Sequence, residues 1–343
     1  MTGKKGLQIV LAARPQGNVT PDDFRLEEFA LPEPSPGEFL MKVDYLSLDP
    51  YMRGRMDDRK SYAEPLRIGE VMRGETVSTI VASNHADYSK GEVVLAHTGW
   101  RTHAISRGKG VRRIDPGEFP VTTRLGVLGM PGFTAYAGMK AIGKPASGET
   151  VVVAAACGPV GSLVGQLAKI AGARAVGIAG GSKKCAYLKE ELHFDAAVDH
   201  RSPDFQAVLA AACPQGIDVY FENVGGAVWQ AVLPLLNQFA RVPVCGLVAQ
   251  YDGPEKTEAR DRLAAAMRQI LSQRILLQGF IVYDFTEKYY ADFLRDVPGW
   301  ILEGSVKYRE DIIDGLENAP QAFIGMLAGK NFGKLLVRVG VEK

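Results

Sequence analysis

The glycines of the segment ACGPVGSLVG, residues 156–165, have a spacing that could hold a phosphate group. They follow an uncharged run, TVVVAA, and precede SLVGQLAKIAG, in which apolar residues recur at helical spacing. A strand, a glycine turn and a helix in this order are typical of dinucleotide-binding folds, because glycines let the backbone turn tightly and approach the pyrophosphate. The helix start then offers free N–H groups to the phosphates. Gly158, Pro159, Val160 and Gly161 therefore predict a dinucleotide site. A turn used only for helix–strand packing is the alternative.

The end of the next strand-like run distinguishes between NAD and NADP. An NAD site usually has an acid about 20 residues further on, which binds the ribose hydroxyls. Here that place is taken by Gly180 and Gly181, and SKK follows at 182–184. Small residues leave room for a 2′-phosphate, and lysines supply charge for it. Lysine at a helix start opposes the helix dipole, so a nearby anion explains Lys184 better than an ordinary solvated helix start does. The sequence favours NADP(H), and His200 with Arg201 could extend this pocket.

These segments belong to a longer alternation of strand-like and helix-like runs. Strand-like runs lie at 149–156, 174–180, 196–200, 216–224, 240–246 and 274–282, and helix-like runs at 162–171, 182–192, 204–212, 227–236 and 258–271. Such alternation predicts a doubly wound parallel sheet. Residues before about 122 consist mainly of β-like runs cut by turns, and the tail segment NFGKLLVRV is a strand that returns to this first part. We expect an α/β protein with a Rossmann domain at 126–314 and a mostly β domain at 1–125 and 315–343.

Composition excludes several classes of protein. The 343 residues are 46% hydrophobic and carry a net charge of +1, so they can build the cores of two domains and present no strong field to nucleic acid or an acidic membrane. The four cysteines lie far apart, which indicates reduced thiols. The uncharged stretch 150–168 is nearly long enough to span a bilayer, but its glycines and proline fit a strand, a turn and a buried helix better. The N-terminus does not resemble a secretory signal. We expect a soluble cytoplasmic protein.

Motifs over nearly the whole chain carry a family resemblance. They are SLDPYMRGRM, TGWRTHAIS, LGMPGFTAYAGM, AAACGPVGSLVGQLAK, DVYFENVGG, VCGLVAQYD, GFIVYDF and FIGMLAGKNFGKLLVRV. With them the chain resembles the zinc-independent medium-chain dehydrogenases/reductases, in the branch of prostaglandin reductases, leukotriene hydroxydehydrogenases, curcumin reductases and alkenal double-bond reductases. The resemblance implies a Rossmann domain joined to a GroES-like catalytic domain, and a homodimer formed through the last strand of the nucleotide domain, near Leu276–Val282.

The zinc ligands of the zinc-dependent relatives have no counterparts in this sequence. Those relatives carry a cysteine after an early strand, a Gly-His-Glu motif and a lobe with four cysteines. Here the first two places are LSLDPYMR and Arg73-Gly74-Glu75, and the lobe has no cysteine. The five histidines show no ligand-like spacing. We therefore expect no metal site.

The resemblance also implies which residues bind the cofactor. Gly158–Gly161 would hold the pyrophosphate and Lys184 the 2′-phosphate, while His200 stands where relatives usually have tyrosine. Asn223 would lie beside the cofactor at the end of the fourth strand. Further contacts would come from the nicotinamide side and from the tail, at Cys245, Gly246, Leu247, Tyr251, Phe280, Ile281, Val282 and Asn331.

Two tyrosines match the hydrogen-bond donors of this branch. They are Tyr51, in DPYMR, and Tyr251, in AQYD. The implied reaction delivers a hydride from NADPH to the β-carbon of an enone or enal, and the carbonyl oxygen then needs a donor as the enolate forms. A free tyrosine has a pKa of about 10 and is protonated at neutral pH. Alternatively, each tyrosine is a structural residue whose ring packs against the protein and whose hydroxyl points to water.

Other functions remain open at this point. An NADPH quinone reductase of the same superfamily would share the fold and cofactor, although DPYMRGRM and GFIVYDF argue against it. A methyltransferase would be expected to keep an acid after the second strand. A non-catalytic NADPH-binding structural protein would bind the cofactor without turnover. The reverse reaction, oxidation of an allylic alcohol, is also possible. The charged loop at 251–261 could act as a lid over the substrate.

Overall fold

The computed structural model describes residues 5–115, 117–251 and 262–340, which divide into two compact units. Unit 1 comprises Met1–Leu125 and Glu310–Lys343, and unit 2 comprises Gly126–Arg309. The chain therefore re-enters unit 1 at Glu310, whereas the sequence suggested residue 315. The reason lies in strand pairing, because β14 (Glu310–Asp314) runs parallel to β15 (Lys334–Arg338) within the sheet of unit 1.

The described part of unit 2 contains a six-stranded sheet in which every neighbouring pair is parallel. Its strands are β8 (Thr150–Ala154), β9 (Arg174–Ala179), β10 (Ala196–Asp199), β11 (Ile217–Phe221), β12 (Leu236–Val244) and β13 (Leu276–Gly279). Their order is β10-β9-β8-β11-β12-β13, so the winding reverses between β8 and β11. In open parallel sheets ligands bind outside the carboxyl ends of the strands at such a reversal. The predicted Rossmann sheet is confirmed.

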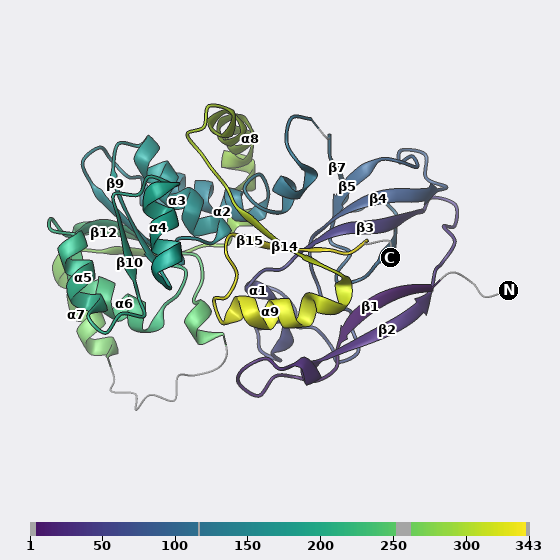
Figure 1. Ribbon diagram of the computed structural model, residues 1–343, viewed down its shortest axis with the longest axis horizontal. Coiled ribbons are helices and arrows are strands. Elements are labelled where there is room, and N and C mark those ends of the chain that lie inside the picture. Colours follow the sequence, from purple (N-terminus) through teal and green to yellow (C-terminus); the bar gives the residue numbers. More distant parts are fainter. Residues whose placement is uncertain (1–4, 116, 252–261, 341–343) are drawn as a thin grey trace. The chain divides into compact units, whose positions relative to one another are not determined.

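α-Helices accompany the sheet of unit 2, and several of them pack on it (Figure 1). They are α2 (Met130–Gly138), α3 (Pro159–Ile170), α4 (Ser182–Glu190), α5 (Phe205–Ala212), α6 (Gly226–Val232), α7 (Leu263–Gln273) and α8 (Thr286–Leu302). α3 contacts β8 and β9, while α4 contacts β9 and β10. In the helix-like run at 227–236 the α-helix ends at Val232, because Pro234 has no N–H to continue its hydrogen bonds; a 3-10 turn at Leu233–Leu235 follows, and β12 already begins at Leu236. In the part of the chain that is described, every helix is too short or too polar to cross a membrane.

Unit 1 is mostly β, as predicted. An antiparallel hairpin of β1 (Lys5–Leu11) and β2 (Phe24–Ala30) accompanies a sheet with the order β14-β15-β3-β4-β5-β7, in which β6 also pairs with β3. The remaining strands are β3 (Phe39–Ser47), β4 (Thr76–Ser83), β5 (Val93–Ala96), β6 (His103–Ser106) and β7 (Arg112–Arg113). β15 pairs antiparallel with β3, so the tail strand returns to this unit.

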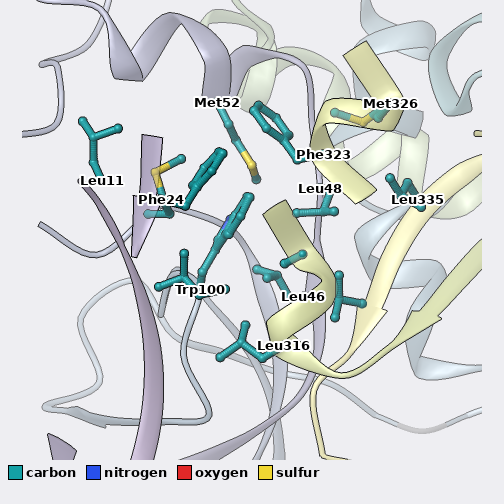
Figure 2. Close-up of a cluster of buried hydrophobic side chains, with 14 of the residues drawn as sticks. Leu11, Phe24, Leu46, Leu48, Met52, Trp100, Leu316, Phe323, Met326 and Leu335 are labelled. Carbon is teal, nitrogen blue, oxygen red and sulfur yellow. The ribbon is translucent and has the colours of Figure 1, made fainter. Parts of the chain in front are cut away.

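An aromatic cluster forms the centre of the core of unit 1 (Figure 2). The rings of Phe24 and Trp100 stack with centroids 5.6 Å apart, and Phe323 of α9 (Ala319–Leu327) meets both rings edge-on. Met52 of α1 (Tyr51–Met56) belongs to the same buried cluster. Because aromatic and sulfur contacts of this kind are closely packed, they hold the short helix α1, and with it Tyr51, in one orientation.

Candidate cofactor site and active-site residues

The glycine turn after β8 brings the start of α3 close to the strand. The Gly158 N–H donates to the Ala155 carbonyl at 2.9 Å, and α3 begins at the next residue, Pro159. A Cβ on Gly161 would lie 2.5 Å from the Ala155 carbonyl oxygen, so only glycine fits there. The first N–H groups of a helix have no partner within the helix. The turn therefore serves helix–strand packing and also leaves donors that fit a pyrophosphate.

Basic side chains follow the two strands next to this turn, while β10 itself ends in Asp199. Gly180 and Gly181 follow β9, and a Cβ on Gly180 would lie 2.9 Å from Nε2 of His200, which follows β10. Burial lowers the pKa of His200, and the charges of Arg201 and Lys184 lower it further. The ring is therefore neutral at pH 7. The structure brings His200 and Arg201 against Gly180, and the charge of Lys184 acts on His200, which fits a ribose 2′-phosphate.

The carboxyl ends of β8, β11, β12 and β13 are joined by hydrogen bonds. The Asn223 side-chain amide donates to the Ala154 carbonyl at 2.9 Å. The N–H groups of Cys245 and Gly246 donate to the Glu222 carbonyl at 2.9 and 3.2 Å, and the Phe280 N–H donates to the Val244 carbonyl. The predicted residues Asn223, Cys245, Gly246 and Phe280 therefore lie at adjoining strand ends. Ile281 and Val282 follow Phe280 directly, and Val282 is buried.

Tyr251 folds back over the end of β12. Its hydroxyl lies 3.3 Å from the position that a Cβ on Gly246 would take, and the Asn223 carbonyl oxygen lies 3.5 Å from the same position. Leu247 packs beside Gly225 in this region. Tyr251, Asn223, Gly246 and Leu247 thus form one group in unit 2. The remainder of the proposed lid, residues 252–261, lies outside the described residues.

Glu222 organises this group, although the sequence arguments did not single it out. Its carboxylate Oε1 accepts hydrogen bonds from the Val224 and Gly225 N–H groups at 2.6 and 2.8 Å and from the Tyr220 hydroxyl at 3.0 Å. Burial raises the pKa of Glu222, while these donors act in the opposite direction. The side chain thus holds the backbone directly after Asn223. The signal in the sequence is the acid directly before Asn223 in FENVGG.

Burial disfavours the nucleophilic form of the Cys245 thiol. Burial, with a contribution from the Glu222 carboxylate, raises its pKa to about 12. Only a thiolate is a strong nucleophile, and at neutral pH this thiol is protonated. The thiol of Cys245 is therefore neutral, and the backbone N–H of this residue donates to the Glu222 carbonyl.

In unit 1, a buried ion pair fixes the segment that leads to Tyr51. Lys334 Nζ lies 2.6 Å from Asp49 Oδ1 and also donates to the Leu48 carbonyl at 2.9 Å. The Ser47 hydroxyl donates to the other oxygen of Asp49. Asp49 and Lys334 are 4% and 2% exposed. Both charges are therefore compensated within the protein, and the ammonium of Lys334 serves the fold.

Arg53 connects the helix α1 to neighbouring segments through a second set of buried hydrogen bonds. This buried side chain donates to Asp57 at 2.7 Å and to the Gly17 carbonyl at 3.1 Å. Arg53 thus forms a structural ion pair.

Tyr51 itself is half-buried at the start of α1, and the Arg55 guanidinium lies 5.9 Å from its ring centroid. Asn331, in the turn before β15, donates through its side chain to the Gly333 carbonyl at 2.9 Å.

Glu75, which precedes β4, should make the stability of the protein depend on pH. Desolvation raises its pKa to about 7; Asp49 adds to this increase, while Arg112 and Lys334 oppose it. The folded protein holds this proton up to about pH 7, whereas the unfolded chain releases it near 4.5, so stability falls as the pH rises between these values.

Glu75→Gln removes this titration. At pH 8 we expect the variant to be more stable than the wild type by up to about 3 kcal/mol, and at pH 5 we expect a much smaller difference. Urea unfolding at the two pH values measures both. An equal difference at pH 5 and pH 8 would contradict this interpretation of Glu75.

No group of three or more His, Cys, Asp or Glu side chains among the described residues could hold a metal ion. Family models nevertheless place the chain with dehydrogenases. Residues 7–114 match a family described as the N-terminal domain of oxidoreductase, and residues 159–297 match one described as zinc-binding dehydrogenase.

Individual relatives cover almost the full length. The NADPH-dependent curcumin reductase of Escherichia coli is 53% identical over 96% of both chains, and prostaglandin reductase 1 of Bos taurus is 38% identical over 94% of this chain and 95% of the relative. The crystal structure of CurA from Vibrio vulnificus in complex with NADPH is 52% identical, with a TM-score of 0.94 over 98% of this chain and 100% of that one.

The fold and the strand-end site are those of a dinucleotide-dependent oxidoreductase. The chain belongs to the medium-chain dehydrogenase/reductase family, in the zinc-independent branch of curcumin and prostaglandin reductases. The resemblance stated from the motifs is thereby confirmed.

Proposed function

We propose that this protein uses NADPH to reduce the C=C bond of α,β-unsaturated aldehydes and ketones. The observation that carries the proposal is the turn after β9, where Gly180 and Gly181 stand in place of an acid, His200 and Arg201 lie against Gly180, and the charge of Lys184 acts on His200. Such a turn suits a 2′-phosphate and offers no acid of its own to the ribose hydroxyls of NAD. The names of the relatives, which include an NADPH-dependent curcumin reductase, support the same cofactor and a double-bond reduction.

The two tyrosines are assigned as hydrogen-bond donors to the substrate. When bound, NADPH supplies a hydride to the β-carbon of the enone. Negative charge then develops on the substrate carbonyl oxygen, and a donor placed there stabilises the transition state. Tyr251 lies beside Asn223 and Gly246, and Tyr51 is the first residue of α1. The proton that completes the reaction reaches the α-carbon from water or through a tyrosine hydroxyl.

Most of the proposed cofactor residues lie in unit 2. In unit 2, Gly158–Gly161 bind the pyrophosphate, Lys184 and His200 bind the 2′-phosphate, and the strand-end residues Asn223 and Cys245–Leu247 with Phe280–Val282 bind the nicotinamide half. Asn331, in unit 1, is proposed on the resemblance alone. The Glu222 carboxylate positions the backbone around Asn223 and is not itself in contact with the substrate.

NADPH oxidation with a panel of acceptors tests the proposal. The panel contains a medium-chain 2-alkenal, an aryl enone and a benzoquinone, and NADH is run in parallel. We expect turnover of the alkenal and the enone with NADPH, with the product saturated at the C=C bond. Turnover of quinone alone would move the protein to the quinone reductases. NADPH binding without any turnover would favour a non-catalytic NADPH-binding structural protein. Turnover of an allylic alcohol with NADP⁺ would reveal the reverse reaction.

The edge strand β13 supports the proposal that the protein is a homodimer. β13 is the last strand in the described order, and its Leu276 and Leu277 are 49% and 45% exposed. An exposed apolar edge strand is a surface that pairs readily with another chain. The four cysteines are free thiols, which agrees with a reducing compartment and supports a cytoplasmic location.

Leu277→Lys is expected to convert the dimer to a monomer, because it places a charge in the apolar edge. Sedimentation velocity measures the change. Leu302→Lys, at the end of α8, is the control, since Leu302 is also exposed but lies on a helix. A wild-type protein that sediments as a monomer would exclude the proposed dimer.

A further inference from the structure

We infer that Arg55 is a positioning residue, whose guanidinium contacts the rings of Tyr51 and Tyr62 and so sets the orientation of the Tyr51 side chain. The inference rests on the proposed function, because it takes the Tyr51 hydroxyl as a donor to the substrate carbonyl. It gives a role to Arg55 and Tyr62, which are not among the site residues implied by the family resemblance.

Arg55 and Tyr51 lie on the same face of α1. Residues four apart are neighbours on a helix surface, and a long side chain points back toward the start of the helix. The Arg55 guanidinium carbon is 5.9 Å from the centroid of the Tyr51 ring. Cation–π contacts extend to about 6 Å, so this contact by itself holds the ring only weakly. A second contact therefore decides where the guanidinium lies.

Tyr62 supplies the second contact, from the loop that follows α1. The Arg55 guanidinium carbon is 4.6 Å from the centroid of the Tyr62 ring. The same loop is tied to the backbone of Arg55, because the Leu66 N–H donates to the Arg55 carbonyl at 2.8 Å, and the Leu66 side chain is buried in the core of unit 1. Tyr62 is 61% exposed, so core packing does not account for its position. The loop thus brings its ring to the guanidinium.

The acids that directly follow α1 are paired with other arginines. Asp57 accepts a hydrogen bond from Arg53 at 2.7 Å, and Asp58 lies 3.6 Å from Arg14. Among the residues that the structure describes, Arg55 forms no ion pair with an acid, and its printed partners are the two rings. A guanidinium is attracted to the faces of aromatic rings, and here no carboxylate of the described chain draws it away.

The orientation of the Tyr51 ring matters for the rate. A donor stabilises the developing enolate only when its hydroxyl lies where the oxyanion forms. A displacement of about 1 Å in a catalytic geometry can cost about 100-fold in rate. Tyr51 is half-buried, so packing against the core restricts only part of its side chain. The guanidinium of Arg55 restricts the rest.

Single-turnover hydride transfer to an uncharged 2-alkenal tests the inference. Stopped-flow absorbance of NADPH gives the rate at saturating cofactor and alkenal. Arg55→Met keeps a long side chain without the guanidinium, and we expect the rate to fall by about tenfold because the donor is misplaced. The KM for the alkenal and the Kd for NADPH should change little. A raised KM with an unchanged rate would overturn the inference and make Arg55 a substrate-binding residue.

Matched variants separate this contact from a general loss of charge or of stability. Arg59→Met removes an exposed positive charge from the same loop and should keep the wild-type rate. Arg55→Lys should recover part of the rate, since an ammonium is also attracted to ring faces. Tyr62→Leu should slow the reaction as much as Arg55→Met, and the double variant should be no slower than either single variant. Arg55 is only half-buried, so urea midpoints should stay close to that of the wild type.

The Tyr51→Phe background shows whether Arg55 acts through Tyr51. Without the hydroxyl, the orientation of the ring no longer affects the enolate, so Arg55→Met is expected to cause no further loss of rate there. A merely structural role would slow both backgrounds equally. The same tenfold loss in the Tyr51→Phe background would therefore overturn the inference.

The outcomes distinguish this inference from the proposed function. If Tyr51→Phe is slow and Arg55→Met is as fast as Arg59→Met, the role of Arg55 is overturned while Tyr51 stands as a donor. If Tyr51→Phe keeps the full rate, the assignment of Tyr51 fails, and the inference fails with it. Slow transfer in Arg55→Met and Tyr62→Leu, with no further loss from Arg55→Met once the Tyr51 hydroxyl is removed, supports Arg55 as the positioning residue.

Discussion

Tyr251→Phe is expected to lower kcat for enone reduction by about 100- to 1,000-fold, which is the usual loss when one donor to a developing oxyanion is removed. The Kd for NADPH should change little, because the substitution keeps the ring and removes only the hydroxyl, which lies 3.3 Å from the position that a Cβ on Gly246 would take. Stopped-flow measurement of a single turnover gives the hydride-transfer rate, and fluorescence titration gives the Kd.

The control for this variant is Tyr289→Phe, which removes a hydroxyl from helix α8 in the same unit. We expect it to keep the wild-type rate. A full rate in Tyr251→Phe would remove Tyr251 from the mechanism and leave Tyr51 as the candidate donor. A large rise in the Kd for NADPH, with an unchanged rate at saturation, would instead make Tyr251 a cofactor-binding residue.

Lys334→Met is expected to destabilise the protein by about 3–5 kcal/mol, because it leaves the Asp49 carboxylate buried without its counter-ion. The pair is 2.6 Å apart, and both residues are almost fully buried. Urea denaturation measures the loss as a lower midpoint.

The double variant Asp49→Asn with Lys334→Met tests the cause of that loss. It removes both charges, so we expect it to recover more than half of the lost free energy. A single variant within about 1 kcal/mol of the wild type would show that water or another group compensates Asp49. If the double variant is no more stable than the single one, the lost free energy of unfolding comes from the packing of the lysine side chain and not from the unpaired charge.

Most elements of unit 2 could be predicted from periodicity. The strand-like run at 149–156 and the helix-like run at 162–171 became β8 and α3, and the alternation that follows gave the parallel sheet. Boundaries were less predictable. The extension of β12 back to Leu236 depends on its pairing with Ile217 of β11, a residue far away in the chain. The return to unit 1 at Glu310 likewise depends on pairing with β15.

The sequence by itself determined the chemistry of the cofactor turn. Two features of this turn are local properties of the sequence and do not depend on the fold. They are the spacing of Gly158 and Gly161 and the absence of an acid at Gly180 and Gly181. Local spacing decides backbone geometry, and residue type decides charge, so the expectation of a dinucleotide with a 2′-phosphate needed no tertiary contact. The matching family motifs led to the tyrosines for the same reason.

Only the tertiary structure decided which side chains act together. Arg201 covers Gly180 because β9 and β10 are adjacent in parallel register, and Lys334 reaches Asp49 because β15 lies beside β3. Glu222 supports the backbone around Asn223 through burial that composition does not reveal. Each of these roles depends on the register between strands distant in sequence, and register is set by the packing of the whole sheet.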